Sequence, residues 1–212
     1  MPVDFEVKGH VAHITLNRPE AMNALDPASI DSLDGIWREV KDNPAIRVSV
    51  LTGAGSKSFC TGTDMKSTPA PKEFMAAIYL RDRQPILPSM KMWKPIIAAI
   101  NGYAVGGGLE MALACDMRIA SANAKFGLTE VKVASLAGLN GTQMLLRVLP
   151  HAVAMKMLLT GELISADEAL RYGLVSDLVE PASLMETATM YAEKVAKAAP
   201  LSVQAAKQAA VL

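Results

Sequence analysis

The chain has 212 residues, of which 51% are hydrophobic and 20% charged, and its 21 Lys and Arg balance 21 Asp and Glu. This composition predicts one sizeable packed domain, with or without an appendage, and excludes disorder. The neutral charge balance gives no electrostatic basis for nucleic acid or an anionic membrane as the main partner. No uninterrupted apolar run reaches about 18 residues, so no transmembrane helix is expected.

The two cysteines, Cys60 and Cys115, lie far apart and lack the spacing of metal ligands. They predict two buried, reduced thiols in a cytoplasmic protein. The acidic N-terminus has no apolar segment of the signal-peptide type, which favours the same location. The three histidines are dispersed without metal-binding spacing, so no metal site is expected.

The first part of the chain alternates strand and helix patterns. Asp26 and Pro27 are typical of an N-cap and a first helical residue, and the helix that follows carries an apolar face up to about residue 41. The run at 95–100 is continuously apolar, as in a buried strand. In chain order the expected elements are strands at 5–7, 11–16 and 46–52, a broken helical pattern at 71–92, a strand at 95–100, a helix at about 107–114, and strands at 117–120 and 124–126.

From about Asn140 onward the pattern is helical apart from residues 174–179. Ser165 and Glu168 form a capping-box pattern, and Gly173 is placed to end that helix. Two further helices are expected, from Pro181 to about 199 and from Leu201 to 212. The last is amphipathic and stops without a cap, so we expect a fragment or a natural end further on. The whole order predicts an α/β fold.

The most informative segment is a triple glycine, Gly106-Gly107-Gly108, which runs into a predicted helix. Glycine lets a backbone approach a ligand closely, and a helix N-terminus presents unpaired N–H groups with a positive dipole end. A second tight turn, 59–64, follows an earlier strand and could supply a second N–H donor. Two donors on one oxygen suit an enolate or tetrahedral oxyanion.

Known glycine-rich and nucleophile motifs do not fit the chain. The pattern G-x-G-x-x-G is absent, which argues against a Rossmann fingerprint, and no Gly-Lys-Ser/Thr completes a P-loop. No Gly-x-Ser-x-Gly elbow is present, which argues against an α/β-hydrolase.

Two carboxylates follow in apolar settings. Glu110 could be a surface residue that favours the helix dipole, but its apolar neighbours predict burial and a raised pKa. Glu130 could instead cap a loop or pair with Lys132. Together with the glycine segment, the pair predicts acid/base catalysis beside an oxyanion hole.

At this point the chain resembles the enoyl-CoA hydratase/isomerase (crotonase) family over almost its whole length. The resemblance is strongest from Lys94 to Glu110. Other matching segments, in order, are 14–19, 22–25, 50–55, 59–64, 115–116, 126–127, 141–143 and 166–175.

The resemblance implies a spiral of ββα units with two roughly perpendicular sheets, followed by C-terminal helices. It implies an acyl-CoA-binding core over residues 1–199, and in residues 200–212 the incomplete start of a helical trimerisation region. The expected partners are an acyl-CoA thioester and further copies of the chain, as a homotrimer or a dimer of trimers, with no nucleic acid or membrane. No cofactor is expected, because coenzyme A is part of the substrate.

The resemblance also implies roles for residues. The backbone N–H groups of Thr63 and Gly107 would hold the thioester oxygen, and Glu110 and Glu130 would act as the acid/base pair of a hydratase. The other residues expected around the substrate are Ala24, Leu25, Thr61, Asp64, Met65, Lys66, Gly106 and Leu139.

The chain departs from the family in two places. Thr61 and Thr63 stand where alanines are usual. The main-chain N–H of Thr63 can still serve as the donor, but its methyl and hydroxyl narrow or polarise the acyl pocket. The loop at 137–142 reads Ala-Gly-Leu-Asn-Gly-Thr where Pro-Gly-x-Gly-Gly-Thr is frequent. The function indicated is 2-enoyl-CoA hydration. The alternatives are enoyl-CoA isomerisation or carnitinyl-CoA-type dehydration within the family, and a non-catalytic acyl-CoA-binding or assembly protein outside it.

Overall fold

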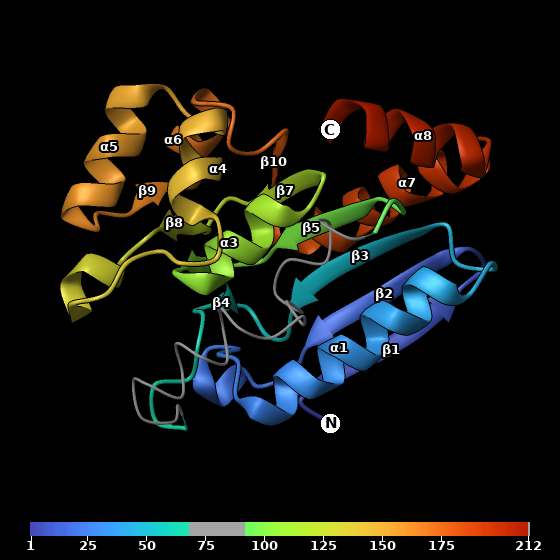
Figure 1. Cartoon of the computed structure of the whole chain (residues 1–212), viewed down its shortest axis with the longest axis horizontal. Coiled ribbons are helices and arrows are strands. Elements are labelled where there is room, and N and C mark those ends of the chain that lie inside the picture. The colour runs from blue at the N-terminus through green and yellow to red at the C-terminus, as the bar shows by residue number, and fades with distance from the viewer. Residues whose placement is uncertain (68–91, 212) are drawn as a thin grey trace.

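The computed structural model describes residues 1–67 and 92–211 (Figure 1). The helical pattern expected at 71–92 lies, except for Met92, outside the described residues. The strands are β1 (Val3–Lys8), β2 (Val11–Leu16), β3 (Val48–Gly53), β4 (Ser58–Cys60), β5 (Ile96–Ile100), β6 (Tyr103–Val105), β7 (Met117–Ser121), β8 (Lys125–Gly127), β9 (Ile164–Ser165) and β10 (Asp177–Val179). The α-helices are α1 (Pro27–Asp42), α3 (Gly107–Ala114), α4 (Gly141–Val148), α5 (His151–Thr160), α6 (Ala166–Arg171), α7 (Leu184–Lys197) and α8 (Pro200–Val211). Short 3-10 helices are η1 (Pro19–Ala21), η3 (Glu130–Val133) and η4 (Pro181–Ser183).

The larger sheet has the strand order β1-β2-β3-β5-β7-β10. β1 and β2 form an antiparallel hairpin, and every later neighbour is parallel. β3 and β5 are buried at every position, because helices cover both faces of the sheet. This explains why their sequences are apolar without alternation.

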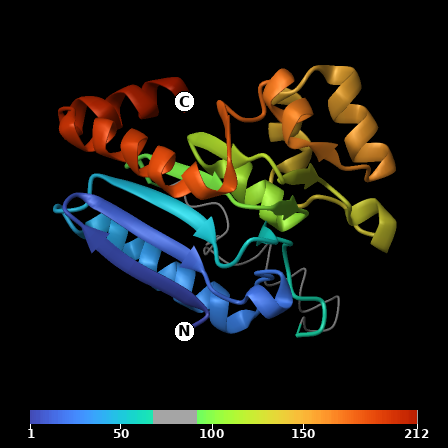
Figure 2. The ribbon, with the colours of Figure 1, turned by 180° about the vertical axis from the view of Figure 1, so that it is seen from behind.

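Helices α1 and α7 lie on opposite faces of this sheet (Figures 1 and 2). Alternate residues of β2 divide between the two cores: Val11 packs with the face of α7, whereas Ala12 and Ile14 pack with the face of α1. This follows from the two-residue side-chain period of a strand. The sheet is therefore a middle layer between two apolar cores.

The smaller sheet has the order β4-β6-β8-β9. Successive strands alternate between the sheets, since β3, β5 and β7 belong to the larger one and β4, β6 and β8 to the smaller one. The chain thus repeats a pair of strands, one in each sheet, and α3 directly follows the pair β5 and β6. This arrangement confirms the α/β fold of ββα units expected from the sequence.

The structure confirms the helix caps and the apolar helix face that the sequence predicted from residues close together in the chain. The carboxylate of Asp26 accepts a hydrogen bond from the Ser29 N–H at 2.8 Å and caps α1. Ser165 and Glu168 form the reciprocal capping box of α6. Leu33, Trp37 and Val40 are the buried apolar face of α1.

Some element bounds differ from the sequence-based expectation. β4, β6 and β9 have two or three residues each and were not predicted as strands, because such short strands exist only through their pairing with distant partners. The strand expected from residue 46 begins at Val48. The helix expected from Pro181 starts as the 3-10 turn η4, and α7 follows it from Leu184.

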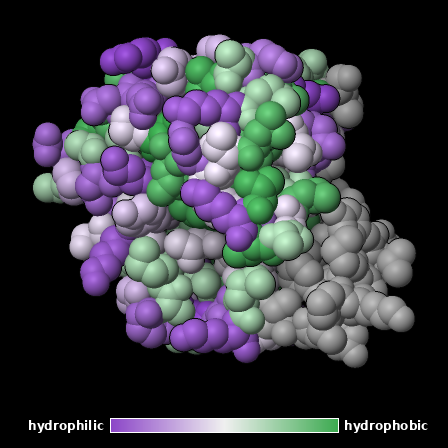
Figure 3. Space-filling view, turned by 90° about the vertical axis from the view of Figure 1, so that its left-hand side faces the viewer, coloured by the Kyte–Doolittle hydropathy of each residue, from purple (hydrophilic) through white to green (hydrophobic). Residues whose placement is uncertain are grey.

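The surface carries apolar side chains on the side of α5. Figure 3 shows a band of hydrophobic residues there, and the exposed residues on nearby elements include Val133, Leu136 and Leu159. At the other end of the chain, α8 has no buried residue. Within the described residues, no helix is both long and apolar enough to span a membrane.

Candidate active site

The start of α3 packs against the turn after β4. Gly106 has a φ of 56° and Gly62 a φ of 86°, both in the region that favours glycine. A Cβ on Gly62 would lie only 2.8 Å from the amide nitrogen of Gly107. The turn after β4 and the start of α3 can therefore approach each other only because Gly62 and Gly107 have no side chains. This explains the glycines in these two segments of the sequence.

Two backbone N–H groups, those of Thr63 and Gly107, lie close together where the start of α3 meets the turn after β4. Leu25 forms a parallel bridge with Thr63, in which Leu25 N donates to Gly62 O and Asp64 N donates to Leu25 O. In a parallel bridge the N–H of the central residue points the other way, so the Thr63 N–H is directed away from Leu25. The Thr63 nitrogen lies 3.9 Å from where a Cβ on Gly107 would be. As the first residue of α3, Gly107 also has no partner within the helix for its own N–H.

Glu110 lies in the first turn of α3 and is 3% exposed. Its Oε1 accepts hydrogen bonds from the N–H of Leu139, at 2.7 Å, and of Gly141, at 2.8 Å. Burial raises its pKa to about 7; the two hydrogen bonds oppose the rise and the charge of Glu130 adds to it. The carboxyl is therefore buried, as its apolar neighbours predicted, and is poised to exchange a proton near neutral pH.

Glu130 is the first residue of η3, and burial raises the pKa of its carboxyl. Its Oε1 would lie 3.3 Å from a Cβ on Gly106, which places it beside the start of α3. Its Oε2 is buried and has no hydrogen-bond partner among the described residues. The described ion pairs also include none between Glu130 and Lys132, so the alternative of such a pair gains no support.

The remaining predicted residues divide between the site and the surface. Leu25 and Leu139 are buried and Ala24 is 9% exposed, whereas Thr61 and Thr63 are half-buried. Asp64 is half-buried, and Met65 and Lys66 are exposed at the end of the same turn. Gly106 is buried beside Glu130. The fold thus brings the two glutamates, the glycine segment and Leu139 together, and leaves Met65 and Lys66 at the rim.

Arg18 is a residue of this region that the sequence did not single out. Its guanidinium contacts Asp64 Oδ2 at 3.0 Å and Asp26 Oδ2 at 3.3 Å, and donates to the carbonyl of Ala24 at 2.6 Å. The hydrogen bond from the Arg18 guanidinium, followed by that from the Lys66 N–H, holds the pKa of Asp64 below its usual value. Arg18 therefore joins the segment around Ala24 to the turn after β4. The only signal was its place directly before Pro19, which does not reveal such distant partners.

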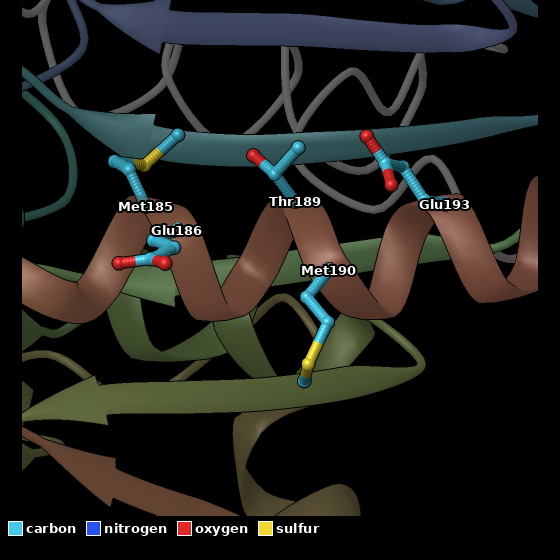
Figure 4. A pocket seen from close by; sticks show the side chains of 5 residues that line it. All are labelled: Met185, Glu186, Thr189, Met190 and Glu193. Carbon is cyan, nitrogen blue, oxygen red and sulfur yellow. The ribbon is translucent and has the colours of Figure 1, made fainter.

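The surface hollows on α7 are separate from these groups. One is lined by Met185, Glu186, Thr189, Met190 and Glu193 (Figure 4). A second lies between α7 and the β1–β2 hairpin and includes His13 and Glu193. Neither is lined by a residue of the glycine segment or by Glu110 or Glu130, so the chemistry lies elsewhere.

The family model for enoyl-CoA hydratase/isomerase matches residues 6–211. The chain belongs to this family, as its motifs indicated, and it is an enzyme.

Its relatives cover the chain almost completely. It is 76% identical over 212 residues to (E)-benzylidenesuccinyl-CoA hydratase of Thauera aromatica, a match that covers 100% of this chain and 83% of that protein. It is 40% identical over 208 residues to the short-chain-enoyl-CoA hydratase of Clostridium acetobutylicum, covering 98% and 80%. The crystal structure of enoyl-CoA hydratase from Bacillus anthracis superposes with a TM-score of 0.93 at 39% identity, covering 99% of this chain and 82% of that one.

Proposed function

We propose that the protein catalyses the reversible syn addition of water to the double bond of a 2-enoyl-CoA thioester. The observation that carries the proposal is the meeting of the buried Glu110 and the half-buried Glu130, both with raised pKa values, beside the amide groups of Thr63 and Gly107. Hydration needs a base for water, an acid for the α-carbon, and donors for the thioester oxygen.

Each group has a defined part in the proposed reaction. The N–H groups of Thr63 and Gly107 hold the thioester oxygen as negative charge develops on it. Glu110 takes a proton from water while the water oxygen bonds to C3 and the double-bond electrons move toward the thioester oxygen. Glu130 then gives its proton to C2, which restores the thioester carbonyl. The reverse sequence is dehydration.

The substrate we propose is a 2-enoyl-CoA with an aryl group on the double bond and one free carboxylate in the acyl part in addition to the thioester. The 76% identity to a protein named for benzylidenesuccinyl-CoA supports this choice. The hydroxyls of Thr61 and Thr63 support it too, because they add polar groups to the turn that carries the Thr63 N–H. The Thr61 hydroxyl already donates to Met22 O at 3.3 Å, so Thr63 is the better donor for a substrate carboxylate.

The reaction class is tested by following the loss of the conjugated thioester absorbance with crotonyl-CoA and (E)-benzylidenesuccinyl-CoA. We expect turnover in the parent and a loss of at least about 10²-fold in kcat for both Glu110→Gln and Glu130→Gln. Glu186→Gln, on the exposed face of α7, is the matched control. A loss in Glu130→Gln alone would favour isomerisation, and binding of a saturated acyl-CoA without turnover of either substrate would favour a binding protein.

The substrate choice is tested by substitution of Thr63. Loss of one hydrogen bond to a charged group costs about 1.5 kcal/mol or more, so Thr63→Ala is expected to raise KM about tenfold for benzylidenesuccinyl-CoA but not for crotonyl-CoA. Thr63→Ser retains the hydroxyl and should retain the lower KM, and Thr189→Ala is the remote control. Equal effects on both substrates would contradict the proposed contact.

Self-association remains a prediction. The expected homotrimer and the proposed role of residues 200–212 in forming it are tested by sedimentation of the purified protein. The exposed apolar band near α5 and the unburied α8 are surfaces that association would cover. A single species with the mass of one chain, 22.5 kDa, would contradict the expectation.

A further inference from the structure

Two amide groups separated by one residue converge on a single oxygen of Glu110. The N–H of Leu139 and that of Gly141 donate to Oε1 at 2.7 and 2.8 Å. In an extended strand the N–H groups at such positions would point to one side along a row, too far apart to share one acceptor. The residue between them must therefore turn the backbone sharply.

Asn140 makes that turn. Its φ is 85° and its ψ is −3°, in the left-handed region, and it precedes the first residue of α4. A left-handed residue between neighbouring amides creates a concave group of N–H donors that suits an anion. Asparagine is among the non-glycine residues that enter this region most readily.

Space around the turn is tight. A Cβ on Gly141 would lie 2.9 Å from Glu110 Oε1 and 3.0 Å from the Cβ of Ala137. A side chain at position 141 would therefore collide with the Glu110 carboxyl. The clamp on Oε1, that is, the two hydrogen bonds from Leu139 and Gly141, depends on the backbone path through Asn140.

We propose that Asn140 is a positioning residue for Glu110: its left-handed backbone directs the N–H groups of Leu139 and Gly141 onto Oε1 and leaves Oε2 to take the proton from water. The catalytic part of this inference rests on the proposed hydration, in which Glu110 is the base. The backbone part concerns the carboxyl itself and can be measured without any reaction.

The charged surroundings of Glu110 make the clamp important. Glu130 of η3 is the second carboxyl near Glu110, and in its ionised form it raises the Glu110 pKa. On the elements packed against α3, Cys60 of β4 has a pKa of about 12 and stays neutral, while Tyr103 of β6 and Arg147 of α4 are exposed. The two N–H donors thus oppose burial and Glu130, and they favour the ionised form that a base requires.

The direct test is the titration of the Glu110 carboxyl, followed by ¹³C NMR of glutamate-labelled protein and assigned with Glu110→Gln. We expect Asn140→Gly to keep the parent pKa, since glycine adopts the same backbone. Asn140→Val, with a β-branched side chain that resists a positive φ, is expected to raise the pKa by about one unit or more. Asn140→Ala is the milder variant if Asn140→Val fails to fold.

Ala134 provides a matched control. It lies in the same loop with a φ of 54°, and its N–H donates to the carbonyl of Glu130 rather than to Glu110. Ala134→Val should strain the loop similarly but leave the Glu110 pKa unchanged. The proposal is overturned if Asn140→Val leaves that pKa unchanged, or if Asn140→Gly or Ala134→Val raises it as much.

The kinetic test uses the pH profile of kcat/KM. A rise of one unit above about 7 would leave about one tenth of Glu110 ionised at pH 7, so Asn140→Val should lose about fivefold there and recover by about pH 9. A general disturbance would lower kcat/KM equally at every pH and would contradict the positioning role. If the parent itself lacks hydratase activity, the proposed function fails, while the NMR titration still decides whether Asn140 sets the carboxyl.

Discussion

The carboxyl of Glu130 lies directly beside Gly106, so that a Cβ on Gly106 would be 3.3 Å from Glu130 Oε1. The same glycine directly follows β6 and precedes α3, the helix that carries Glu110. Its N–H donates to Gly127 O on β8 at 2.9 Å. One residue therefore connects the smaller sheet, the start of α3 and the second carboxyl. The two glutamates are held in a common frame although they lie 20 residues apart in sequence.

Substitution of Gly106 should therefore affect activity more than stability. Gly106→Ala introduces a Cβ against Glu130 at a φ of 56°, and we expect kcat/KM to fall about 10²-fold, with a cost in unfolding free energy of about 1–2 kcal/mol. Gly173→Ala is the matched control, because Gly173 has a φ of 80° but no heavy atom within 4 Å of the position that a Cβ would take. It should show a similar stability cost with activity retained. Equal kinetics in the two variants would contradict the role given to Gly106.

The hydration rate should follow the protonation of both carboxyls. Glu110 must be ionised to act as a base, and burial has raised its pKa to about 7, so kcat/KM should rise with pH through about 7. Glu130 must keep its proton to act as the acid, and burial raises the pKa of its carboxyl, which extends the pH range in which it stays protonated; kcat/KM should fall where Glu130 loses that proton. The measurement is the pH profile on a 2-enoyl-CoA. A profile without a rise between pH 6 and pH 8, about one unit on either side of that pKa, would contradict Glu110 as the base.

The raised pKa of Glu110 also predicts a cost to stability. A carboxyl whose pKa rises from 4.5 to about 7 on folding binds its proton more tightly in the folded state. The protonated carboxyl therefore stabilises the folded state fully below about pH 4.5, and this stabilisation is lost as the pH rises through about 7. Glu110→Gln removes this dependence, so its free energy of unfolding relative to the parent should increase between pH 5 and pH 8 by about 3 kcal/mol at most.

Denaturant unfolding of both proteins across that pH range measures the difference. Glu186→Gln, at an exposed position, should follow the parent at every pH. Parallel pH dependences of Glu110→Gln and the parent would show that the buried carboxyl is not destabilising.

The hydrogen bonds to Glu110 show what the sequence could predict and what it could not: the acceptor was predictable, and its donors were not. Burial of Glu110 followed from its apolar neighbours on one helix, and the caps at Asp26 and Ser165 followed from residues within one turn. The donors at Leu139 and Gly141 could not be predicted, because they are main-chain groups about 30 residues away whose direction depends on the backbone of Asn140. Every residue except proline has a backbone N–H, so no residue type in the sequence marks these two as donors.

Pairing partners limited the prediction in the same way. β6 has only three residues, and it is a strand because β4 and β8 flank it. Arg18 contacts Asp64 across 46 positions, which neither periodicity nor a motif reveals. The segment 94–110 was informative because its glycines mark a backbone approach that few other residues permit. The sequence therefore predicted the place of the site better than its contacts.

The ion pair between Lys207 and Asp116 should anchor α8 to the rest of the protein. Lys207 Nζ lies 2.8 Å from Asp116 Oδ2 and donates to Lys94 O at 3.3 Å, and the Lys207 side chain is only 7% exposed. The same Asp116 oxygen accepts the N–H of Ile96 at 2.7 Å, so it joins α8 to the start of β5. Because no residue of α8 is buried as a whole, we expect this polar contact to contribute to its attachment.

Lys207→Met removes the charge, keeps most of the side-chain volume and leaves Asp116 without its cation. We expect the free energy of unfolding to fall by about 2 kcal/mol, below the usual range for fully buried pairs because Asp116 is partly exposed. Faster proteolysis within α8 should accompany this loss. The exposed Lys197→Met is the control. A double-mutant cycle with Asp116→Asn should give a coupling of about 1 kcal/mol or more, and additive effects of the two substitutions would show that the pair does not hold α8.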